Sequence, residues 1–160
     1  MATVIRKLNK KIWMDSEIAQ QLGGLQADAL KNFQTTDNTL SIFYVDDVVP
    51  PERVAAVIAL GGDRLDNVDF VTFDDEILSL IDVAPIKVPG QTVDSCVNQK
   101  HVDLTRLTAA KILGLANQIQ NEGTCSRITK KQAIKILKNL HEAGSLDVSN
   151  IKPGVLSQIT

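Results

Sequence analysis

The sequence predicts a mixed α/β fold: a small mixed or parallel sheet of three to five strands with helices packed on it, followed by a helical C-terminal part. Three observations predict this fold class. Runs of β-branched and aromatic residues alternate along the chain with amphipathic helical patterns. Hydrophobic residues make up 44% of the 160 residues, so the chain can bury a core. Its two cysteines are too few for a disulfide scaffold.

The first elements are short. Strands are expected over residues 3–5 and 11–14, at an edge of the sheet, because lysines in such strands deter pairing with another chain. Asp15 or Ser16 then caps a helix that ends at Gly23, where glycine allows the left-handed conformation. A second helical run follows over residues 25–33.

The middle of the chain predicts a crossover between two strands. Residues 40–45 are rich in aromatic and β-branched side chains, which is typical of a buried strand. Pro50 and Pro51 begin a helix that reaches Leu60, and residues 68–73 form the next strand. A strand, a helix and a strand in this order predict a right-handed parallel crossover. Asp74 or Asp75 then caps a short helix.

Prolines and a glycine interrupt the pattern after residue 84. We therefore expect an α/β domain over residues 1–84, an extended linker or edge segment over 85–102, and a helical part over 103–160 that packs on the first domain. In that last part, Asp103 is expected to cap a long helix over 104–120. Thr129 and Gln132 have the spacing of a capping box for a second helix, which ends at Gly144.

Charge is distributed unevenly although the net charge is only −2. Acidic residues dominate between residues 46 and 82, and basic residues dominate between 100 and 138. This asymmetry fits contact with nucleic acid, or two parts of the protein that face each other. The first residues lack the apolar stretch of a signal peptide, and no run of apolar residues is long enough for a membrane span. The expected location is therefore the cytoplasm, without membrane association.

Aspartates follow several predicted strands. Carboxylates gathered at strand ends are ligands for Mg²⁺, which would suit a metal-dependent phosphoesterase or nuclease. The alternative is that some of them cap helices and that the others lie in solvated loops. The candidate metal ligands are Asp15, Asp46, Asp47, Asp74 and Asp75.

Cysteine and histidine offer two further hypotheses. Cys96, His101, Cys125 and His141 have the composition of a zinc site but lack the usual paired spacing. Cys96 and His101 also have the composition of a thiol nucleophile with its base. The third reading is that both thiols are inert, since a free cysteine usually behaves as a small buried hydrophobe.

The helix that begins after Thr129 carries lysines on its outer face. Lys131, Lys135 and Lys138 form this lysine stripe, which would bind nucleic-acid phosphates without sequence specificity. The alternative is a face that lies in solvent or docks on the acidic region.

No motif for catalysis or phosphate binding has the required spacing in this sequence. We therefore expect a non-catalytic binding or regulatory protein that acts through protein–protein contacts, without a cofactor. The partner would be another protein or a second copy of the chain. The alternative functions are the phosphoesterase or nuclease on the aspartates and a nucleic-acid-binding module on the lysine stripe.

Overall fold

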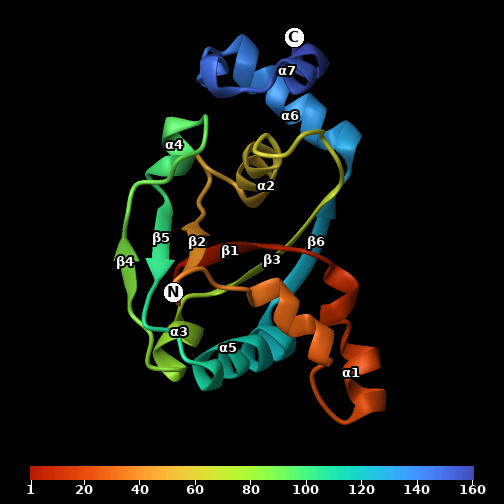
Figure 1. Ribbon diagram of the computed structural model, residues 1–160, viewed down its shortest axis with the longest axis vertical. Coiled ribbons are helices and arrows are strands. Elements are labelled where there is room, and N and C mark those ends of the chain that lie inside the picture. The colour runs from red at the N-terminus through yellow and green to blue at the C-terminus, as the bar shows by residue number, and fades with distance from the viewer.

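The computed structural model describes all residues 1–160 as a six-stranded sheet with helices on both faces (Figure 1). The strands lie in the order β4-β5-β2-β1-β3-β6, and every neighbouring pair is antiparallel. The strands are β1 (Thr3–Leu8), β2 (Leu40–Tyr44), β3 (Val68–Asp74), β4 (Pro85–Lys87), β5 (His101–Leu104) and β6 (Thr124–Ile128). The α/β class is confirmed, but the expected three to five strands in a mixed or parallel sheet are wrong.

The position of β1 explains the error in strand direction. β2 and β3 do run in the same direction, as the crossover predicts, but β1 lies between them and is antiparallel to both. The expectation that β1 is an edge strand is also wrong. Val4 is buried on one side of β1 and Ile5 on the other, so apolar residues cover both faces of this strand. A strand buried on both faces belongs in the middle of a sheet.

Helices on the two faces enclose two separate cores. On one face, α2 (Pro51–Ala59), α4 (Ser95–Asn98), α6 (Lys130–Glu142) and α7 (Pro153–Ile159) contribute to a core with Ile5, Phe70 and Ile128. On the other face, the 3₁₀ helix η2 (Ala27–Phe33), α3 (Glu76–Leu80) and α5 (Ala109–Glu122) contribute to a core with Val4 and Val71. The remaining helical elements are η1 (Lys11–Met14), α1 (Ser16–Leu22) and η3 (Val148–Asn150).

Local signals placed several helix ends correctly. Asp15 caps α1 through hydrogen bonds from the backbone N–H groups of Glu17 and Ile18, and Gly23 ends that helix at φ 75°. Both halves of the predicted capping box are present at Thr129 and Gln132, where α6 begins.

Two predicted elements are wrong. Residues 11–14 form η1 and not a strand. Asp103 lies in β5 and does not cap a helix, because β5 pairs with β2 through residue 104 and α5 begins only after its cap Thr108. The segment 85–102, expected as a linker or edge, forms β4, α4 and the start of β5. The residues on both sides of it, including β6 from the expected helical part, contribute strands to one sheet.

A buried ion pair connects α2 to α4. The carboxylate of Asp94 is fully buried, and its Oδ2 accepts hydrogen bonds from Arg53 of α2, with the Nε and Nη2 atoms each at 2.8 Å. Its Oδ1 accepts from the backbone N–H groups of Cys96 and Val97 and so caps α4. One side chain therefore fixes both the start of α4 and its distance from α2.

Replacing Arg53 by methionine is expected to lower the free energy of unfolding by about 3–5 kcal/mol, because the Asp94 carboxylate would stay buried without its counterion. Urea denaturation followed by circular dichroism measures this change. The control is the double variant with Arg53→Met and Asp94→Asn, which removes both charges, keeps an oxygen to cap α4 and should cost less. An Arg53→Met protein as stable as the wild type would contradict this account of the ion pair.

A second ion pair joins β3 to β6. Asp69 is 7% exposed, and its two carboxylate oxygens accept from Nε and Nη2 of Arg127 at 2.5 and 2.9 Å. The backbone N–H of Lys11 donates to the same carboxylate. Burial raises the pKa of Asp69, but the hydrogen bonds from Arg127 and Lys11 outweigh burial and hold this pKa below its ordinary value.

The Asp69 carboxylate should therefore stabilise the fold in a pH-dependent way. Its folded-state pKa lies below the unfolded-state value of about 3.9, so its contribution is complete above that pH and is lost as the pH falls through the folded-state pKa. An Asp69→Asn variant should be less stable than the wild type at pH 7, and the difference should shrink below about pH 4. Urea midpoints measured across this range test it, and a difference independent of pH would be the contrary result.

Candidate ligand-binding cleft

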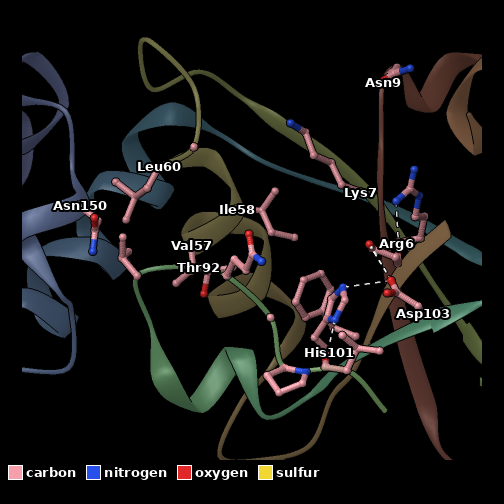
Figure 2. Close-up of a pocket in the computed structure, with 18 residues that line it drawn as sticks. Arg6, Lys7, Asn9, Val57, Ile58, Leu60, Thr92, His101, Asp103 and Asn150 are labelled. Atoms are coloured by element: carbon pink, nitrogen blue, oxygen red, sulfur yellow. Dashed lines mark hydrogen bonds and ion pairs between the residues drawn. The ribbon is translucent and has the colours of Figure 1, made fainter. Parts of the chain in front are cut away.

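A cleft of about 680 Å³ opens on the α2 face of the sheet. Helix α2 covers β1, β3 and β6, so parts of β2 and β5 on this face are left without a long helix above them. We call the space the sheet cleft. Its floor comes from β1, β2 and β5, and its walls are the C-terminal half of α2 and the segment 88–93 that leads from β4 to α4 (Figure 2).

The floor carries three polar side chains in strand register. Ser41 pairs with Asp103 across β2 and β5, and Phe43 pairs with His101, so all four side chains are on the cleft side. The Ser41 hydroxyl donates to Oδ1 of Asp103 at 3.1 Å. The rings of Phe43 and His101 are in edge contact, with centroids 5.0 Å apart.

His101 is oriented by the cleft wall. Its Nδ1 lies 2.8 Å from the carbonyl oxygen of Val88, so this nitrogen carries the proton and donates. Its Nε2 lies 3.5 Å from Oδ1 of Asp103, too far for a good hydrogen bond. Asp103 therefore stands between Ser41 and His101. A catalytic triad requires the histidine next to the serine, so this arrangement does not activate Ser41 as a nucleophile.

Arg6 lies at one end of the cleft, where β1 separates from β2. The two strands pair only at Val4 and Ile5, whereas β1 pairs with β3 along all its residues. Beyond that point, Nη1 of Arg6 donates to the Ser41 carbonyl at 2.8 Å. Its Nε is buried without a hydrogen-bond partner, and the guanidinium is in no ion pair. Burial lowers the pKa of Arg6 to about 10.

Hydrogen bonds hold the 88–93 segment in place as the second wall. The Asn98 side chain accepts from the backbone N–H of Thr92 at 2.7 Å and donates to the Thr92 carbonyl at 2.8 Å. The N–H of Gly90 donates to the Asn98 carbonyl at 3.0 Å. Gly90 passes so close to Asn98 that a Cβ there would lie 2.8 Å from its Oδ1. This wall is therefore built before any ligand arrives.

The remaining wall is apolar. Val57, Ile58 and Leu60 of α2 face the cleft, with Val93 on the opposite segment. Figure 2 shows Arg6, Asp103 and His101 together at one end, and Leu60 and Asn150 at the other. The sheet cleft thus has a charged end and an apolar side, which is typical of sites for small organic molecules.

The predicted aspartate ligands do not form a metal site. No three His, Cys, Asp or Glu side chains lie close enough together to hold a metal ion. Asp15 follows the C-terminal end of β1 and caps α1, whereas Asp75 accepts from the backbone N–H of Ala2 beside the other end of that strand. Asp74 accepts from the N–H of Glu76.

Asp46 and Asp47 follow β2 in a turn. Asp46 accepts from Lys100 and from the backbone N–H groups of Val48 and Val49, and these interactions hold its pKa below the ordinary value. Asp47 is exposed. The interpretation of Asp15 as a helix cap is confirmed. At α3, Asp75 is at the N-cap position but its side chain makes no capping hydrogen bond, and Asp74 accepts from the first N–H of the helix.

The cysteines and histidines are also dispersed. The ring nitrogens of His101 face Val88 and Asp103 and not Cys96, so the two do not form a thiol–base pair. Burial raises the pKa of the Cys125 thiol on β6, which keeps this thiol protonated. Neither cysteine is in a disulfide.

The lysine stripe faces away from the core. Lys131, Lys135 and Lys138 are exposed and are in no ion pair, so α6 does not dock them on the acidic region. Binding of nucleic acid by this face stays a prediction. None of the helices is long and apolar enough to cross a lipid bilayer.

Sequence reasoning missed Arg6, Ser41 and Asp103 as parts of a site. One signal was available: Arg6 alternates with Val4 and Leu8, whose side chains are buried in the core on the α5 face. Its guanidinium reaches the Ser41 carbonyl at the opening between β1 and β2. A charged residue at such a position needs a partner or a function.

No protein-family model, characterised protein or solved structure shows significant similarity to this chain.

The 88–93 wall gives a test of the cleft's architecture. Replacing Gly90 by alanine is expected to destabilise the protein by about 1–3 kcal/mol, the usual cost of forcing an extra carbon into a packed site. The new Cβ would also lie 3.2 Å from Cβ of His101, so the NMR signals of the His101 ring should shift. The control is Gly154→Ala in α7, where no atom lies within 4 Å of the new carbon. Equal stability of both variants would contradict the tight approach at Gly90.

Proposed function

We propose that this protein is a non-catalytic binding protein that takes a small organic anion with an apolar group in the sheet cleft. The observation that carries the proposal is Arg6. It is a partly buried cation with one hydrogen bond, to the Ser41 carbonyl, and no counterion.

A cation in this position is costly without an anion. Moving a charge away from water is unfavourable unless it is paired and hydrogen-bonded. The lowered pKa of Arg6 reflects the same loss of hydration. Lys7, the next residue of β1, also lines the cleft and is in no ion pair. An anion placed beside the Arg6 guanidinium would restore its lost interactions.

The apolar part of the ligand follows from the α2 wall. Val57 and Leu60 of this wall are buried and Ile58 is partly exposed, so a hydrocarbon group on the ligand would cover Ile58, which a ligand with only a charge would leave in contact with water. Burial of apolar area contributes about 25 cal/mol per Å². The non-catalytic role rests on the arrangement of Ser41, Asp103 and His101, in which the histidine does not reach the hydroxyl. Action through a protein partner, or through a second copy of the chain, stays a separate proposal, because nothing about the cleft requires it.

The test uses 4-methylpentanoate, a carboxylate with a branched apolar chain, titrated by calorimetry. It should bind the wild type, and replacing Arg6 by methionine should weaken binding about tenfold or more, since a hydrogen bond to a charged group contributes about 1.5–3 kcal/mol. Lys131→Met is the matched control, because it removes one positive charge from the exposed face of α6 and should leave binding unchanged.

Two results would contradict this proposal. One is that neither 4-methylpentanoate nor any other carboxylate with a branched apolar chain binds the wild type. The other is equal binding to the wild type and to Arg6→Met, since the carboxylate would then lie elsewhere. Unfolding curves of both variants establish that the fold is intact before the titrations are compared.

A further inference from the structure

Two opposite charges in the sheet cleft are held near each other but are not paired. Arg6 donates to the carbonyl oxygen of Ser41, and Asp103 accepts from the hydroxyl of the same serine. Yet no nitrogen of Arg6 lies within 4.0 Å of a carboxylate oxygen, and the one basic nitrogen that close to the Asp103 carboxylate is Nε2 of His101. Figure 2 shows Arg6 and Asp103 near each other, at the charged end of the cleft.

Asp103 has capacity for another hydrogen bond. Its side chain is 19% exposed, and both of its neighbours, the Ser41 hydroxyl and Nε2 of His101, approach Oδ1. Its Oδ2 accepts no hydrogen bond within the protein. An ionised carboxylate has about four acceptor positions, so Asp103 offers a free acceptor toward the cleft.

We infer that the ligand of the sheet cleft is a zwitterion, an apolar α-amino acid whose carboxylate binds Arg6 and whose ammonium group binds Asp103. This inference rests on the proposed function and specifies its ligand. An α-amino acid carries its ammonium and carboxylate groups on the same carbon atom, so it fits between a cation and an anion that share one anchoring residue. Ser41 holds the two protein groups apart and prevents them from neutralising each other.

The rest of the cleft matches the side chain of such a ligand. Val57, Ile58 and Leu60 form an apolar wall of the same cleft, and the ring of Phe43 on its floor is in edge contact with His101. The cavity of about 680 Å³ is within the range of about 300–1,000 Å³ that small-molecule sites usually have. It therefore has room for a branched or an aromatic side chain.

The experiment compares three probes that differ by one charged group. L-Leucine has both charges, 4-methylpentanoate lacks the ammonium group, and 3-methylbutylamine lacks the carboxylate. Calorimetric titration of the wild-type protein should give L-leucine an affinity at least about tenfold higher than that of either half, because each half leaves one charged group of the cleft without a partner. L-Phenylalanine should bind as well as L-leucine, and glycine, which lacks the apolar group, should bind more weakly.

Replacing Asp103 by asparagine should then change two affinities in opposite directions. L-Leucine loses its ammonium partner and should bind about tenfold more weakly. 4-Methylpentanoate no longer meets a like charge and should bind more tightly. Asparagine keeps an oxygen for the Ser41 hydroxyl, so the strand pairing of β2 with β5 is preserved, and a general loss of structure would weaken both probes together.

The outcomes separate this inference from the proposed function. If 4-methylpentanoate binds as tightly as L-leucine, the proposed binding of an organic anion is supported and the inference of a zwitterionic ligand is wrong. If only 3-methylbutylamine binds, or if none of the three probes binds, both proposals are wrong. Higher affinity for L-leucine in the wild type, with the opposite changes in Asp103→Asn, supports the inference.

Discussion

The early separation of β1 from β2 is the feature on which the site depends. After Val4 and Ile5, β1 continues beside β3 only, while β2 continues beside β5. A carbonyl in a strand that loses its neighbour must find another donor, because an unpaired backbone group away from water is costly. Arg6 supplies that donor to Ser41, and the same divergence opens the space between α2 and the 88–93 segment. The opening in the sheet and the cation beside it therefore have one structural cause.

Interactions within the protein hold the walls of the cleft in place around this charge. Arg53 and Asp94 fix α4 against α2, and the Thr92 and Asn98 hydrogen bonds fix the opposite wall. If these walls were mobile, they could fold onto the floor and cover the apolar side chains of α2. A preformed cleft keeps the charged groups of its floor apart. Part of the conformational entropy that binding would otherwise cost is therefore lost already when the protein folds.

The sequence predicted the structure where the signals are local. The capping box at Thr129 and the glycine at position 23 placed helix ends correctly, because caps involve residues only a few positions apart. Strand order was not predictable in this way, since the partners of β1 lie far along the chain and the lysines in it suggested an edge. The candidate site could not be predicted from the sequence for the same reason. Its residues come from positions 6, 41, 101 and 103, which are far apart in the sequence. Judged only from its neighbours in the sequence, Asp103 resembles a helix cap.

The strand order also has a consequence for how the chain finds its structure. Val4 pairs with Tyr44 on one side and with Phe73 on the other, so the central strand is complete only after distant segments have met. No two strands are joined by a tight hairpin, and each pairing closes a long loop before it gains any contact. A topology rich in such distant pairings folds slowly for its size. β1 is synthesised before the strands that pair with it, so much of the chain must follow before this strand is protected from other molecules.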